Sequence, residues 1–166
     1  MTLHRRAALG SLAVLGAAPL LLRPGASLAA TGDEYVMLTL EGGAFLKMTS
    51  EMALERATNE ELRTFAELEV AEQDAVAAVL ASTGMAPPAE VDGSEAEMMD
   101  RLSGLEGAEF DAAYLEAQTT GHQEALSIQE EMAAMEDITI PVATAKLAKA
   151  SIESHLATLA MIAARM

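Results

Sequence analysis

A glutamate and two histidines lie at inward-facing positions of predicted helices, and such side chains bind metals or transfer protons. Glu69 lies in the stretch "FAELEVAEQ", in the middle of a helical apolar face that it shares with Gln73 one turn later, while Glu72 lies at the edge of this face. His122 lies beside the apolar face of another helix, and His155 lies on that of a third. The chemistry of the protein depends on whether these side chains meet.

A buried carboxylate without a partner costs several kcal/mol and takes up a proton, whereas beside imidazoles it stays ionised and raises their pKa. Carboxylate and imidazole groups from facing helices also hold metals in helical bundles. One hypothesis is therefore a site for one transition-metal ion (Fe, Cu, Zn or Mn). Its candidate ligands are Glu69, Glu72, His122 and His155.

The alternative is a polar layer in which these groups and Gln73 bond to one another and fix the helix register without a ligand. The spacing favours this alternative over a di-metal centre. Di-metal bundles carry Glu-x-x-His on two helices, and here Thr119 and Ile152 occupy the positions three residues before the histidines.

Ten methionines follow the N-terminal region, among them Met48, Met52, Met132 and Met135, and thioethers are ligands for Cu(I). Methionine at helical spacing more often fills a core, so we interpret these residues as core packing. The sequence contains no cysteine, no G-x-S-x-G and no phosphate-binding glycine loop. It therefore predicts a protein that is not an enzyme.

Amphipathic helices must position the candidate ligands. Apolar periodicity predicts four long helices over about 34–57, 60–84, 108–136 and 139 to the C-terminus, with a short helix at 94–102 in the long connection between the second and third of them. Asn59 is the predicted N-cap of the second helix, and Pro141 lies in the first turn of the last. The predicted fold is an all-α, up-down four-helix bundle.

If successive long helices run antiparallel, residues at equal distances from their connection lie at the same height along the bundle. The number of residues between each candidate ligand and its turn therefore gives its height. Glu69 lies 15 residues before Gly84, and His122 lies 15 residues after Gly107. The same count across the last turn brings His155 to the height of His122. We therefore expect Glu69, His122 and His155 to lie in one layer.

The N-terminus "MTLHRRAALGSLAVLGAAPLLLRPGASLAATGDE" has the basic start, the apolar run of about 16 residues and the small-residue cleavage site of an export signal. It predicts a signal peptide at residues 1–29 and a single domain at residues 30–166, in the periplasm or cell envelope. Arg5 and Arg6 resemble a twin-arginine signal, and general secretion is the alternative route.

The net charge is strongly negative, at −16 for the whole chain, and loss of the three arginines at residues 1–29 leaves 7 basic against 26 acidic residues. This charge argues against binding to nucleic acid or to anionic membrane surfaces. It fits a soluble protein, and it leaves open a second function, an interaction module that presents its acidic surface to a basic envelope protein. The oligomeric state is not predicted.

Several segments resemble the exported helical proteins of domain-of-unknown-function family 4142, some of which are labelled as outer membrane proteins. The resemblance covers "LRTFAELEVAEQ" with "LASTG", "LSGLEGAEFDAAYLEAQTTGHQEAL", and "HLATLA" after a proline. It implies a ferritin-like fold and no established activity. Members often carry Asp-His where this chain has Glu72 and Gln73, and the resemblance implies that this histidine joins those matched by His122 and His155.

Overall fold

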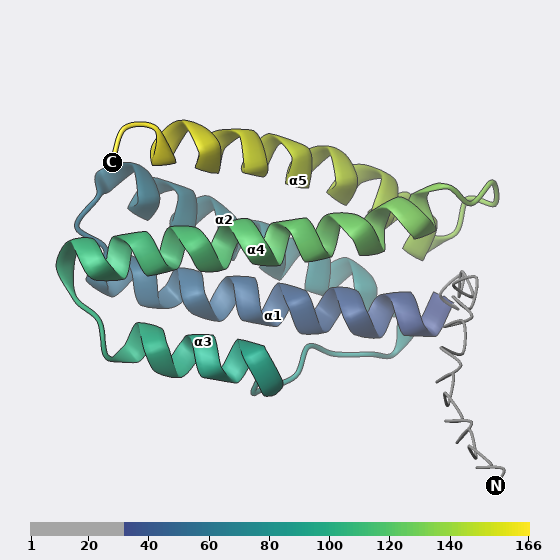
Figure 1. The fold of residues 1–166 in the computed structure, drawn as a ribbon. Helices are drawn as coiled ribbons and strands as arrows, with labels where there is room; N and C mark the ends of the chain where they lie inside the picture. The colour runs from purple at the N-terminus through teal and green to yellow at the C-terminus, as the bar shows by residue number, and fades with distance from the viewer. Residues whose placement is uncertain (1–31) are drawn as a thin grey trace, which may run out of the picture.

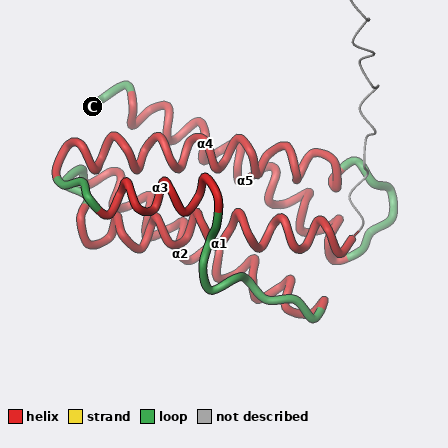
Figure 2. Tube along the Cα trace, turned by 60° about the horizontal axis from the view of Figure 1, so that its bottom comes forward, coloured by secondary structure: helices red, strands yellow, loops and turns green. Residues whose placement is uncertain are grey.

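The structure is a computed structural model, and it describes residues 32–166, so the predicted export signal lies outside the described residues. The elements are α1 (Gly32–Arg56), α2 (Glu60–Leu80), η1 (Ala81–Thr83), α3 (Gly93–Ser103), α4 (Gly107–Ala133) and α5 (Ile140–Ala163) (Figure 1). The described part of the chain contains no strand (Figure 2). None of its helices has the length and apolar content of a membrane span.

The four long helices α1, α2, α4 and α5 pack as a bundle, and α3 lies against the outside of α1 and α4 (Figure 1). Short turns join α1 to α2 and α4 to α5. The longer connection after α2 contains α3 and returns along the bundle before α4 begins (Figure 1). One long crossover of this kind is found in ferritin-like bundles. The predicted all-α, ferritin-like four-helix bundle with a short extra helix is therefore confirmed.

One helix direction differs from the prediction. The residue count assumed that α2 and α4 are antiparallel, and in the structure they run parallel. Asp111 near the start of α4 accepts hydrogen bonds from the backbone N–H groups of Thr58 and Asn59 at the start of α2. From this shared level, Glu69 lies ten residues after Asn59, and His122 lies eleven residues after Asp111. The expected layer forms nevertheless, because both residues lie near the middles of their helices.

Caps define the helix ends. Asn59 accepts from two backbone N–H groups of the first turn of α2, as predicted. The second helix was expected to reach Gly84, but α2 ends at Leu80 and one 3-10 turn leads to Gly84, which has a positive φ of 90°. Gly84 therefore terminates the segment. The short helix α3 begins at Gly93, one residue before the predicted start, and its N-cap is Asp92.

The core of the bundle is divided along its length. One buried cluster is built mainly from Phe45, Leu46, Ala53, Leu62, Phe65, Ala66, Leu102, Phe110, Tyr114, Leu159 and Ile162. The other contains Tyr35, Val36, Leu40, Leu80, Met132, Val142 and Ala145. Buried polar side chains and a pocket lie between the two clusters. The middle of the bundle is therefore the place where polar chemistry is accommodated.

Candidate metal centre

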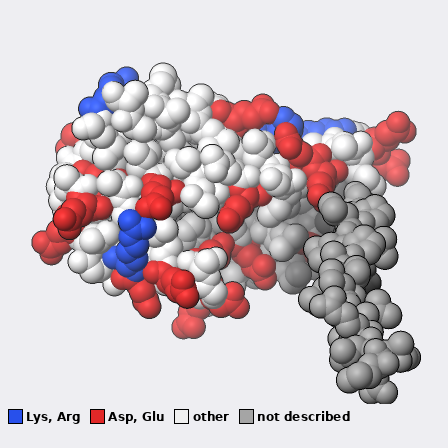
Figure 3. Space-filling view, in the orientation of Figure 1, with Lys and Arg blue, Asp and Glu red and all other residues white. Residues whose placement is uncertain are grey.

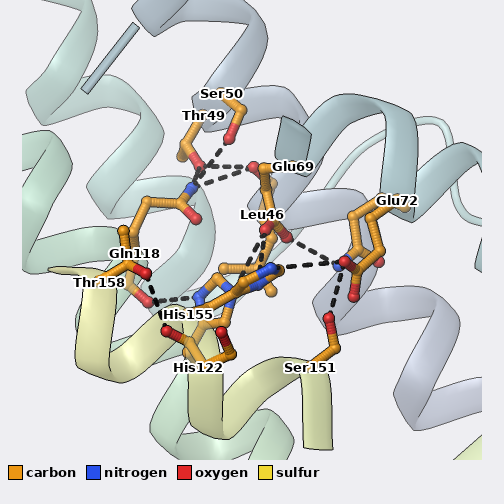
Figure 4. Close-up of polar contacts among 12 residues, drawn as sticks. Leu46, Thr49, Ser50, Glu69, Glu72, Gln118, His122, Ser151, His155 and Thr158 are labelled. Atoms are coloured by element: carbon orange, nitrogen blue, oxygen red, sulfur yellow. Dashed lines mark hydrogen bonds and ion pairs between the residues drawn. The ribbon is translucent and has the colours of Figure 1, made fainter. Parts of the chain in front are cut away.

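Glu69, His122 and His155 converge from α2, α4 and α5, and we call these three residues the triad (Figure 4). The Nε2 atom of His122 and the Nδ1 atom of His155 lie 3.0 Å apart. The Oε2 atom of Glu69 lies 3.3 Å from the first nitrogen and 3.2 Å from the second. The expected layer is therefore present, and it brings three potential ligand atoms within 3.0 to 3.3 Å of one another.

Each imidazole is oriented by an acceptor on its outer side. The Nδ1 atom of His122 lies 2.7 Å from the backbone carbonyl of Gln118, which can only accept, so this nitrogen carries the proton. The Nε2 atom of His155 faces the Oε2 atom of Glu72 at 3.4 Å, and Ser151 donates to the same oxygen at 2.8 Å. In the neutral rings, both inner nitrogens are therefore left with free lone pairs.

The two oxygens of Glu69 have different surroundings. Oε1 accepts a hydrogen bond from Nε2 of Gln73 at 2.8 Å. Oε2, which faces both histidines, is buried and has no donor aligned on it with hydrogen-bond geometry. An unsatisfied buried carboxylate oxygen is unfavourable by at least about 1–3 kcal/mol. This oxygen therefore depends on a charge at the facing histidine nitrogens, or on an ion between the three atoms, to offset its burial.

The three donor atoms fit the face of a metal coordination shell. With bonds of about 2.1 Å, adjacent ligand atoms lie about 3.0 Å apart in an octahedral site and about 3.4 Å apart in a tetrahedral one. The observed separations of 3.0, 3.2 and 3.3 Å fall in this range. An ion bonded to all three atoms would lie about 1 Å out of their plane and would keep at least one position for another ligand. Two imidazoles and one carboxylate suit Fe, Zn or Mn.

Glu72 occupies a different place from the other three predicted ligands. It lies on the far side of the His155 ring, against Nε2, whereas the Nδ1 atom of the same ring faces Glu69 (Figure 4). It can therefore hold the ring and fix its tautomer, which is the usual role of a carboxylate behind a metal-binding histidine. The structure brings together three of the four predicted ligands.

Charge is shared within the triad. Burial alone would raise the pKa of Glu69, but its interactions with His122, His155 and Gln73 outweigh burial and lower the pKa to about 2. Burial would lower the pKa of His155, but Glu69 and then Glu72 outweigh it and raise the pKa. Without an ion, the triad therefore favours an ionised Glu69 beside a protonated His155.

Some residues around the triad were not predicted. Gln118 orients His122 through its carbonyl, and its side chain donates to Thr49, Ser50 and the carbonyl of Leu46. The spacing of four residues from Gln118 to His122 was visible in the sequence and places both on one face.

The aromatic and sulfur-containing side chains have packing roles near the triad. The Phe65 ring lies against both imidazoles, with ring centroids 5.8 Å from His122 and 5.4 Å from His155. Met52 packs against one core cluster and Met132 lies in the other, in agreement with core packing. Met135 is exposed, so the core-packing interpretation is wrong for this residue.

Residues 21–162 match the family described as "Domain of unknown function (DUF4142)". The chain belongs to this family. The match covers the whole triad and confirms the family resemblance found in the sequence. No curated protein matches this DUF4142 chain.

The fold also resembles a solved structure from another family. This is a DUF305 protein from Streptomyces coelicolor, described as a candidate secreted protein. The two share 17% sequence identity with a TM-score of 0.67, over 82% of this chain and 94% of the other. The likeness supports the helical-bundle fold.

Proposed function

We propose that this DUF4142 protein is an exported, non-catalytic bundle that binds one transition-metal ion through Glu69, His122 and His155, and that it serves metal handling or stress protection in the cell envelope. The observation that carries the proposal is the convergence of three acceptor atoms whose separations, 3.0 to 3.3 Å, match a coordination face. The outer nitrogens already have acceptors, so the inner lone pairs are available.

A metal ion satisfies this arrangement better than a proton does. A proton placed on His155 can form a straight hydrogen bond to only one of the two facing acceptors, Glu69 or His122. The other acceptor then stays unsatisfied in a buried layer, which is unfavourable. A single ion held by Glu69, His122 and His155 would satisfy all three atoms at once.

Export rests on the sequence and agrees with the comparisons. Residues 1–29 have the composition of a cleaved signal peptide. The DUF305 protein with a similar fold is described as a candidate secreted protein. No described helix resembles a membrane span. We therefore place the triad in a compartment outside the cytoplasm, the periplasm or the cell envelope.

The alternative function is an interaction module in which the triad only fixes the helix register. It is favoured by the raised pKa of His155, because a protonated His155 pairs with Glu69 without any ion. It also draws on the surface charge, since acidic side chains are spread over the face shown in Figure 3 and basic ones form a few patches. Such a protein would hold a basic envelope protein in a salt-sensitive complex.

Metal analysis of protein purified from its native compartment, without chelator, tests the proposal. We expect close to one equivalent of Fe, Zn, Mn or Cu, and a rise in melting temperature when metal is added to the metal-free protein. Glu69→Gln should remove both effects, whereas Glu67→Gln, at an exposed position of the same helix, should keep them. Less than about a tenth of an equivalent, with no melting shift for any metal, would instead favour the register role.

A further inference from the structure

A pocket of about 520 Å³ lies beside the triad, in the gap between the two hydrophobic clusters. Its walls come from all four long helices, from the connection that leads into α3 and from the first turn of α3. Apolar side chains such as Val76, Ile128 and Ile152 line part of it. A bundle core is normally close-packed, so an opening of this size in the middle of the bundle has room for a ligand.

The pocket shares two wall residues with the surroundings of the triad. Gln73 lines the pocket and donates to Glu69, and Glu72 lines it and faces His155. Gly43 makes room for this wall, because a Cβ atom there would lie 2.5 Å from Oε1 of Gln73. The pocket wall therefore contacts the triad at two points, at Oε1 of Glu69 through Gln73 and at Nε2 of His155 through Glu72.

The charged side chains that line the pocket are all acidic. Its lining contains no lysine, arginine or histidine, and it contains the acids Glu41, Glu72, Glu90, Asp92, Glu95 and Glu124. Among these acids, Glu72 alone has an ion-pair partner in the described part of the chain, His155. Glu95 is half-buried, and its pKa is raised, first by burial and then by repulsion from Glu124, Glu41 and Asp92. The carboxylates therefore repel one another across the pocket, and a cation would relieve this repulsion.

The triad needs an entrance. The side chains of Glu69 and His122 are fully buried, and that of His155 is 17% exposed. A divalent cation arrives hydrated, and six waters at about 30 Å³ each occupy about 180 Å³, which the pocket can hold.

From these observations we infer that the acidic pocket is the entrance of the metal site. Glu41, Glu95 and Glu124 capture a hydrated divalent cation, which then passes the wall of Glu72 and Gln73 to reach the triad. This inference rests on the proposed metal binding. It adds the class of ligand, a hydrated divalent cation rather than a bare Cu(I) ion or an anion, and the path of entry.

Stopped-flow uptake of Co²⁺ by the metal-free full-length mature protein tests the entrance, because Co²⁺ absorbs visible light when bound by imidazole and carboxylate. The test variant carries Glu41→Gln, Glu95→Gln and Glu124→Gln. The control variant carries Glu55→Gln, Glu106→Gln and Glu109→Gln, which remove the same charge from exposed positions at the far end of α1 and the start of α4.

At low salt, we expect the test variant to take up Co²⁺ about tenfold or more slowly than the control, because lining charges of one sign raise on-rates by roughly 10–10³-fold. The difference should shrink as salt screens the pocket, and the final Co²⁺ content should stay at one equivalent. Equal uptake rates in the two variants would overturn the entrance while leaving the metal site in place. No Co²⁺ binding by the unmodified protein would overturn the metal site itself.

Discussion

Replacing Glu69 by glutamine should change how the stability of the metal-free protein depends on pH. The pKa of Glu69 is lowered from its ordinary value of 4.5 to about 2. A carboxylate whose pKa is lower in the folded state stabilises the fold above its unfolded pKa, and this contribution is lost as the pH falls toward the folded pKa. The loss therefore lies between about pH 5 and pH 2.

The magnitude follows from the size of the shift. Each pKa unit corresponds to about 1.4 kcal/mol, so the whole contribution of Glu69 is on the order of 3 kcal/mol. Roughly 2 kcal/mol of it should disappear between pH 6 and pH 3. Glu69 is fully buried, so solvent screening does not reduce this value in the way it does for surface pairs.

Urea unfolding of the unmodified protein and of Glu69→Gln at pH 6 and pH 3 measures the effect. The many surface acids change the stability of both proteins alike, so their contributions cancel in the difference between the two free energies of unfolding. We expect the advantage of the unmodified protein to shrink by about 2 kcal/mol from pH 6 to pH 3. An unchanged difference would show that Glu69 is not held ionised by the histidines.

Three further predictions follow from the contacts of the triad and of the helix ends. Because the pKa of His155 is raised, metal binding at a pH below this pKa should displace about one proton, and the metal affinity should fall about tenfold for each pH unit below it. Calorimetry in two buffers measures the proton release, and an affinity that does not change from pH 5 to pH 7 would contradict the prediction. Gly42→Ala should raise the free energy of unfolding by up to about 1 kcal/mol, because the new Cβ atom meets open space. In Gly43→Ala the new Cβ atom displaces Gln73, so this variant should be less stable than Gly42→Ala by about 1 kcal/mol. Equal melting temperatures for the two alanine variants would refute the close contact. Asp111→Ala should lower the free energy of unfolding in urea by about 2–3 kcal/mol, because the carboxylate accepts three hydrogen bonds at the turn between α1 and α2. A decrease below about 0.5 kcal/mol would be inconsistent with these hydrogen bonds.

The sequence predicts the helices and the inward faces that carry the triad because both depend on local periodicity. The shared level of Glu69 and His122 follows from their positions near the middles of their helices. Asn59 has the type and position of an N-cap, and Glu69 interrupts an apolar face at its centre. The direction of α4 relative to α2 was not predictable in the same way. The connection between Gly84 and Gly107 is long enough to turn back at once or to return along the bundle, and the packing of α3 against α1 and α4 decides between these paths.

The finer geometry of the triad depends on side-chain orientation, which periodicity does not give. Glu72 was predicted as a ligand from its place at the edge of the apolar face that carries Glu69, yet the His155 ring stands between the two carboxylates. Ser151 holds Glu72 from another helix, and no local pattern in α5 indicates this contact.

X-ray absorption spectroscopy of the metal-bound protein tests the central claim most directly, because it reports the atoms bonded to the ion. We predict a first shell that contains two imidazole nitrogens and at least one carboxylate oxygen at about 2.0–2.2 Å. The imidazole signals should be lost when His122 and His155 are both replaced. A shell of sulfur atoms, or of oxygen atoms alone, would contradict binding of the ion by Glu69, His122 and His155.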